Sequence, residues 1–128
     1  MKFSVRTYTF LSDKRPKILF EGHVFWRQLK ALGIDPNEYV MGNEDILYLK
    51  WTREHYKGRA KEYNRLNRAK EIHDKAALAS ASWGTFQIMG FNYGACGFSN
   101  VKSYVKLNTL MKLSISKRLG TSFGQLIY

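Results

Sequence analysis

The strongest constraint on the fold is an amphipathic pattern between about Arg59 and Ala79. Apolar and small residues recur there at spacings of three and four, so they share one face of an α-helix. These residues are Ala60, Tyr63, Leu66, Ala69, Ile72, Ala76 and Ala79. The pattern predicts a single long helix that buries Leu66 and Ile72 against a neighbouring element.

The face opposite this apolar stripe is charged. It carries Lys61, Glu62, Arg65, Arg68, Lys70, Glu71 and Lys75. Surface helices usually turn such residues to water, and we predict a solvated face here. Small residues follow from Ala79 to Ser82, which favours close packing on a second helix that starts at Ser82 and runs to about Ile88.

A β-hairpin is predicted near the amino terminus. Residues 3–10 alternate polar and apolar side chains and are rich in β-branched and aromatic types, which favours a strand. A polar turn over residues 12–16 ends in proline. The apolar run Ile18–Phe20 follows and is most simply the second strand.

The other predicted elements are helices and loops. Apolar spacing predicts a helix over about 24–32, and Gly33 is a natural stop after it. Asp35 and Pro36 predict a short helix with the aspartate as its N-cap. A last helix, capped by serine, is expected over about 99–113. Loops are predicted for residues 41–58 and 90–97. The predicted fold class is therefore α+β, mostly helical, with a small N-terminal β-hairpin.

Chain length and cysteine content limit the architecture further. The 128 residues, 45% of them hydrophobic, suffice for one small domain with one core. No apolar run approaches the ~18 residues that a membrane span needs, and residues 1–11 lack the apolar core of a signal peptide. A single cysteine, Cys96, excludes an internal disulfide framework and a cysteine-rich zinc site.

The net charge of +11 is distributed unevenly along the chain. Residues 75–128 hold six basic residues and no acidic one, so any carboxylate in acid–base chemistry must lie at or before Asp74. Such a chain is attracted to polyanions: nucleic acid, anionic membrane, or an acidic bacterial wall. Nucleic acid is the least favoured partner, because no binding motif accompanies the basic residues of one helix.

Glu21 is the best-placed carboxylate. It directly follows the apolar run Ile18–Phe20, so partial burial is expected, and burial raises the pKa of a carboxyl group. A raised pKa suits a general acid that works near neutral pH. The alternative interpretation is a glutamate at a strand end that forms a salt bridge or points to water.

The segment 79–93 combines aromatic and polar side chains. Trp83 and Tyr93 could offer ring faces to sugar rings, and Ser82, Gln87 and Asn92 carry hydroxyl and amide groups that suit sugar hydroxyls and acetamides. These five residues are our candidate substrate-binding residues. The alternative is a tightly packed helix pair whose aromatic residues belong to the core.

Other common site chemistries find no support in the sequence. His23, His55 and His73 fit no metal-binding spacing, and Cys96 has no evident activator of its thiol. Phosphate-binding glycine loops of the P-loop or Rossmann type are also missing. We therefore predict neither a metal nor another cofactor.

Three segments together resemble a known family. Residues 76–93 read AALASASWGTFQIMGFNY, residues 15–25 read RPKILFEGHVF, and residues 62–66 read EYNRL, followed by Ala69. They are similar to the N-acetylmuramidase domain of phage endolysins and prophage lysis proteins. The resemblance covers roughly residues 10–106, and we expect 107–128 to be a divergent tail of a single, partial domain.

The resemblance implies a lysozyme-like fold and a function. The family cuts the glycan strand of peptidoglycan between N-acetylmuramic acid and N-acetylglucosamine, without a cofactor. It also implies that Ser82 and Gln87 line the substrate groove together with Glu21, which is our candidate catalytic residue because it is the best-placed carboxylate. The partner would be bacterial peptidoglycan, and the protein would be a monomer that stays in the cytoplasm until lysis and then acts on the cell wall.

The two ends of the chain depart from the family pattern. Members carry a helix that ends in glutamate, the expected general acid, and Ser4 aligns with that residue here. Members also continue through further helices after the point that corresponds to Lys106. We therefore expect weak or absent hydrolysis, and the alternative function is a non-catalytic remnant that binds the cell wall or another polyanion.

Overall fold

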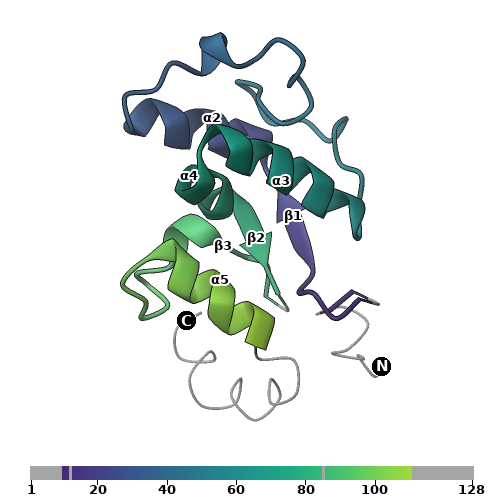
Figure 1. The fold of residues 1–128 in the computed structure, drawn as a ribbon, viewed down its shortest axis with the longest axis vertical. Helices are drawn as coiled ribbons and strands as arrows, with labels where there is room; N and C mark the ends of the chain where they lie inside the picture. Colours follow the sequence, from purple (N-terminus) through teal and green to yellow (C-terminus); the bar gives the residue numbers. More distant parts are fainter. Residues whose placement is uncertain (1–9, 12, 85, 111–128) are drawn as a thin grey trace.

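Four α-helices and a small antiparallel sheet make up the described part of the chain (Figure 1). The structure is a computed structural model, and it describes residues 10–11, 13–84 and 86–110. Its elements are β1 (Ile18–Phe20), α2 (Gly22–Ala31), the 3₁₀ turn η1 (Pro36–Glu38), α3 (Lys61–Ile72), α4 (Asp74–Ala79), β2 (Ala81–Trp83), β3 (Ile88–Met89), the 3₁₀ turn η2 (Gly90–Asn92) and α5 (Val101–Leu110). The predicted α+β, mostly helical class is confirmed.

The sheet has the order β1-β2-β3, with antiparallel neighbours. Ile18 lies opposite Trp83, and Leu19 lies opposite Ser82. The β1 strand is confirmed, but its partner is β2. Of the predicted hairpin, residues 3–9 lie outside the described residues, and Phe10 forms an isolated antiparallel bridge with Pro16.

The long helix predicted over 59–79 is two helices. His73 has an extended backbone (φ −159°, ψ 113°) and separates α3 from α4. Its Nδ1 accepts a hydrogen bond from the Ala76 N–H at 3.1 Å, which caps the first turn of α4. Leu66 is buried as predicted, whereas Ile72, the last residue before the break, is only partly buried.

The predicted helix from Ser82 to Ile88 is wrong, because this segment forms β2, a turn and β3. Gly84 and Gln87 both have a positive φ, 73° and 50°, which reverses the chain. The Gly84 N–H donates to the Lys17 carbonyl at 2.9 Å, so the backbone after β2 also bonds to the chain before β1. Pairing with a distant strand has overridden the local helical pattern.

The remaining helix predictions are largely confirmed. α2 ends near Gly33, which has a φ of 79°, and the Asp35 side chain caps η1 by accepting from the Asn37 N–H at 3.0 Å. At α5 the capping side chain is Asn100 and not the expected Ser99, since Asn100 accepts from the Ser103 N–H at 2.9 Å. No helix among the described residues is long and apolar enough to cross a membrane.

The core lies where α3 packs on β1, α4 packs on β2, and α2 and α5 pack on α4 (Figure 1). Alternate strand residues point into it, and Ile18, Phe20, Ala81 and Trp83 are all at most 3% exposed. The other face of the sheet carries Leu19 and Ser82. This division of faces determines where the candidate site residues lie.

Candidate functional site

Glu21 stands between β1 and α2. Its backbone is still extended (φ −111°, ψ 100°), so the strand alternation continues and its side chain lies on the Leu19 face of the sheet. Its N–H donates to the Ser80 carbonyl at 2.9 Å. The side chain is partly buried, as the sequence predicts.

Tyr56 holds one oxygen of Glu21. The Tyr56 hydroxyl donates a hydrogen bond to Glu21 Oε1, and Trp51 Nε1 donates to the Tyr56 oxygen at 3.1 Å. Burial, together with this hydrogen bond to Glu21, raises the pKa of Tyr56 well above its ordinary value. The phenol therefore stays protonated at neutral pH and remains a donor to Glu21.

The burial of Glu62 contradicts the prediction that the charged face of α3 is solvated. Its side chain is completely buried, and each of its oxygens holds a different segment. Oε1 accepts from the Phe20 N–H and from Arg65 Nη1, both at 2.9 Å. Oε2 accepts from the N–H groups of Lys57 at 2.7 Å and Gly58 at 3.1 Å. One carboxylate thus joins the strand before Glu21 to the loop that follows Tyr56.

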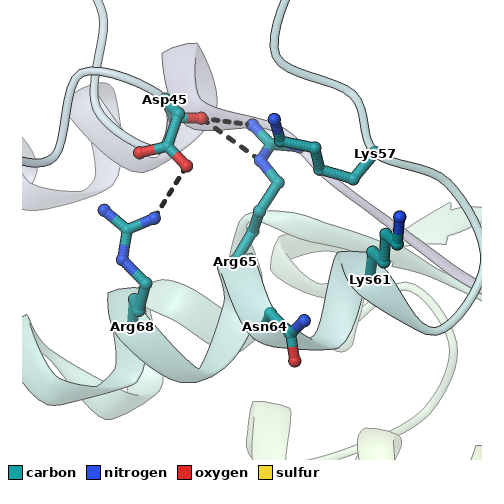
Figure 2. Close-up of a pocket in the computed structure, with 6 residues that line it drawn as sticks. All are labelled: Asp45, Lys57, Lys61, Asn64, Arg65 and Arg68. Carbon is teal, nitrogen blue, oxygen red and sulfur yellow. Dashed lines mark hydrogen bonds and ion pairs between the residues drawn. The ribbon is translucent and has the colours of Figure 1, made fainter.

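Arg65 is buried as well and completes this junction. Its Nη1 donates to the Phe20 carbonyl at 2.9 Å. Its Nη2 and Nε donate to the Asp45 carbonyl at 2.7 and 3.2 Å (Figure 2). The charged face therefore splits: Glu62 and Arg65 turn inward, while Lys61, Lys70 and Lys75 are exposed. The physical reason is that Phe20 and Asp45 present backbone groups that would otherwise be buried without partners.

Ser82 and Gln87 form a second polar group, at the β2–β3 turn. Ser82 Oγ donates to Gln87 Oε1 at 2.8 Å, and Gln87 Nε2 donates to the Gly84 carbonyl at 2.8 Å. Because Ser82 lies opposite Leu19 in the sheet, it shares a sheet face with Glu21. The common groove for Glu21, Ser82 and Gln87 stays a prediction.

The other predicted binding residues lie in different environments. Trp83 is only 3% exposed; it packs edge-on against Tyr63, with ring centroids 6.4 Å apart, and its indole N–H donates to the Leu78 carbonyl at 3.2 Å. Its ring face is therefore part of the core and is not open to a sugar. Tyr93 is partly buried against the core, and Asn92 is exposed at the end of η2.

Sequence reasoning missed Tyr56 and Trp51. Both lie in the segment 41–58, which was predicted as loop, and nothing in their spacing marks them as partners of Glu21. The only available signal was the high aromatic content of that loop. Trp51 is 57% exposed, so unlike Trp83 it does present surface to a ligand.

His23 lies close to Glu21. Burial lowers the pKa of His23, while the negative charge of Glu21 acts in the opposite direction. The His23 ring stacks on Tyr48, with centroids 6.4 Å apart. Among the described residues, no group of three or more histidine, cysteine, aspartate or glutamate side chains could hold a metal ion.

A pocket of about 320 Å³ opens between α3 and the loop that precedes it (Figure 2). It is lined by Asp45, Lys57, Lys61, Asn64, Arg65 and Arg68. Arg68 donates to the Asp45 carboxylate at 2.7 Å, and this contact holds the pKa of Asp45 below its ordinary value despite partial burial. Sequence analysis gave no indication of this pocket.

Helices packed on a small antiparallel sheet, with a glutamate after the first described strand, define a lysozyme-like fold. The N-acetylmuramidase family model matches residues 4–123, and the chain belongs to this family. The match extends past Lys106 and includes most of the segment 107–128. None of the curated proteins compared with the chain matches it.

Among the solved structures that resemble the chain is the crystal structure of the Burkholderia AP3 phage endolysin. The TM-score is 0.71 and the sequence identity is 38%, over 80% of this chain. The matched region makes up 36% of that endolysin, so the chain spans about a third of its length.

Proposed function

We propose that the protein is a peptidoglycan hydrolase that cuts the glycan between N-acetylmuramic acid and N-acetylglucosamine. The observation that carries the proposal is the Glu21–Tyr56 pair, held at the end of β1 in a chain of the N-acetylmuramidase family. The protein would act on the cell wall at lysis, after release from the cytoplasm. Its basic charge would favour contact with an acidic wall.

Glu21 is the residue to which we assign the chemistry. Glycoside hydrolysis needs a proton donor at the leaving oxygen, usually faced by a second carboxylate or a positioned water. Tyr56 holds Glu21 Oε1, and no described residue bonds to the other carboxylate oxygen, Oε2. That oxygen is the atom we propose to donate a proton to the scissile oxygen or to position the water.

Substrate contacts are proposed at the polar groups on and near the same sheet face. Gln87 is partly exposed and would bind sugar hydroxyl or acetamide groups, while Ser82, only 5% exposed, would hold the Gln87 side chain in place. Asn92 and Tyr93 would extend this surface. Trp83 has no such role in our proposal, because its ring is buried, and exposed Trp51 replaces it as the ring for sugar stacking.

Ser4 limits the expected rate. It aligns with the glutamate that the resemblance makes the general acid, and a serine hydroxyl cannot protonate a leaving sugar at neutral pH. A general acid typically contributes ~10²–10⁴-fold to the rate, so we expect slow hydrolysis with glycan binding retained. The same observation favours the second candidate function, which is cell-wall binding without catalysis.

Release of reducing ends from purified peptidoglycan tests the proposal. We expect slow release by the wild type and at least ~10-fold less by Glu21→Gln. Glu38→Gln is the matched control, since Glu38 is exposed on η1. Co-sedimentation with peptidoglycan measures binding separately. Equal release by the wild type and by Glu21→Gln, whether fast or slow, would contradict the role of Glu21.

A further inference from the structure

We propose that the pocket between α3 and the preceding loop is a binding subsite for carboxylate groups. The ligand we infer is the peptide that substitutes the glycan of the bacterial wall. The assignment of this ligand rests on the proposed function, whereas the anion preference of the pocket rests on its own charges.

The charges of the lining residues are only partly balanced. Arg65 is paired with Glu62 at 2.9 Å, and Arg68 is paired with Asp45 at 2.7 Å. Lys57 and Lys61 have no carboxylate partner among the described residues, which include all ten acidic side chains of the protein. Two like charges that share one pocket repel each other unless an anion binds between them.

Nothing in the pocket competes with an anion for these two lysines. The only acidic residue in the lining is Asp45. Its carboxylate bonds to Arg68 and its carbonyl bonds to Arg65 (Figure 2). The exposed side chain of Asn64, on the turn of α3 after Lys61, adds an amide that can bond to a carboxylate or to a peptide group.

The pocket adjoins the proposed catalytic pair. Lys57 directly follows Tyr56, whose hydroxyl bonds to Glu21. The Arg65 guanidinium lines the pocket and also lies 5.8 Å from the centre of the Tyr56 ring. Tyr56 and Arg65 therefore connect the pocket to the Glu21 pair, which is why we infer a substituent of the glycan as the ligand.

Chemistry selects the peptide as the anionic part of such a ligand. The sugars of peptidoglycan carry hydroxyl and acetamide groups, which are neutral, and the free carboxylates lie on the peptide attached to the lactyl group. A pocket with unbalanced positive charge therefore distinguishes peptide-substituted glycan from an uncharged chain of N-acetylglucosamine.

Titration of the ¹⁵N-labelled protein by NMR tests this subsite without requiring hydrolysis. The probe is the free wall tetrapeptide of alanine, glutamate, diaminopimelate and alanine, with chitotetraose as the neutral comparison. The variants are Lys57→Gln combined with Lys61→Gln, and the charge-preserving Lys57→Arg combined with Lys61→Arg. Lys30→Gln is the control, because Lys30 is exposed in the last turn of α2.

The tetrapeptide should shift the amide signals of Lys57, Lys61 and Asn64. Its affinity should fall by about 2- to 30-fold in the double glutamine variant, the range for two exposed ion pairs. It should stay within about 2-fold of wild type in the double arginine variant and in Lys30→Gln.

Two results would overturn the subsite. One is equal tetrapeptide affinity in the wild type and the double glutamine variant. The other is a response of the same signals to inorganic phosphate at lower concentration than to the tetrapeptide, which would make the pocket a phosphate site. The two proposals can fail separately, because tetrapeptide binding by a protein that releases no reducing ends from peptidoglycan would support the subsite and contradict the proposed hydrolase function.

Discussion

The junction of β1 with α3 and the turn between β2 and β3 both hold candidate site residues, but by different means. At the junction, the buried charges of Glu62 and Arg65 bond to Phe20, which is more than 40 residues away in sequence. At the turn, the neutral side chain of Gln87 accepts from Ser82 Oγ and donates to the nearby Gly84 carbonyl, and it also donates to the distant Lys17 carbonyl at 3.2 Å.

This difference shows which part of the site carries buried charge. The turn is held by neutral groups; two of its side-chain bonds are local and one reaches the Lys17 carbonyl. At the junction, the carboxylate and guanidinium avoid a large desolvation cost only when strand, loop and helix are all in place. The position of Glu21 therefore depends on a buried ion pair, while the Ser82–Gln87 pair depends on neutral hydrogen bonds that each contribute less.

The largest effect should come from removing the buried charge of Glu62. Glu62→Gln leaves Arg65 buried without its counter-ion, and breaking a buried pair in this way costs about 3–5 kcal/mol of unfolding free energy. Urea denaturation measures the loss. Glu71→Gln is the matched control on the exposed face of α3 and should change stability by less than about 0.5 kcal/mol. A loss below about 1 kcal/mol for Glu62→Gln would remove the contrast between the two regions.

Leu66 tests the apolar packing beneath the same junction. Its side chain is 2% exposed, so Leu66→Ala should cost about 2–5 kcal/mol through lost burial and the cavity left behind. Ile72→Ala should cost less, because Ile72 is only partly buried beside the break at His73. Thermal or urea unfolding of both variants measures the two losses of unfolding free energy. A larger loss for Ile72→Ala than for Leu66→Ala would contradict the division between α3 and α4.

The β2–β3 turn should respond less to substitution than the junction. Ser82→Ala removes one neutral hydrogen bond to Gln87, which contributes about 0.5–1.5 kcal/mol. We expect the fold to persist, with peptidoglycan binding weakened if the proposed substrate contacts are correct. A loss of stability as large as that of Glu62→Gln would contradict the smaller contribution of neutral hydrogen bonds at the turn.

The smallest effect concerns pH. The pKa of Tyr56 is raised in the folded protein above its ordinary value of 10, so the folded state binds more protons than the unfolded state above about pH 10. Stability should therefore fall as pH rises above about 10. Tyr56→Phe should make this fall shallower, and part of it should remain because burial also raises the pKa of Tyr63 and Tyr104. Parallel wild-type and Tyr56→Phe curves would contradict the Tyr56–Glu21 contact.

Sequence analysis predicted the elements whose signals are local. The apolar run before Glu21 gave β1, apolar spacing gave α2, and Asp35 with Pro36 gave the capped η1 turn. Each depends on neighbours within a few residues. The partial burial of Glu21 followed from the same local context.

The errors arose where distant partners decide the structure. The break at His73 ends a stripe that continues unchanged in sequence, and residues 81–83 form strand β2 because β1 offers an edge for pairing. The burial of the Glu62 side chain could not be predicted from the sequence either. Its partners on Phe20 and Lys57 are backbone N–H groups, which every residue except proline carries. Tyr56 reaches Glu21 only through the loop that Glu62 holds.

The double contact of the Glu62 carboxylate has a consequence for exchange of amide protons with solvent. The N–H of Phe20 bonds to one oxygen, and those of Lys57 and Gly58 bond to the other. An opening that displaces this carboxylate exposes all three amides at once, so they should share one protection free energy once their intrinsic exchange rates are accounted for. The end of an irregular loop would then open together with a β-strand, and a protease that cuts there would report unfolding of the whole domain.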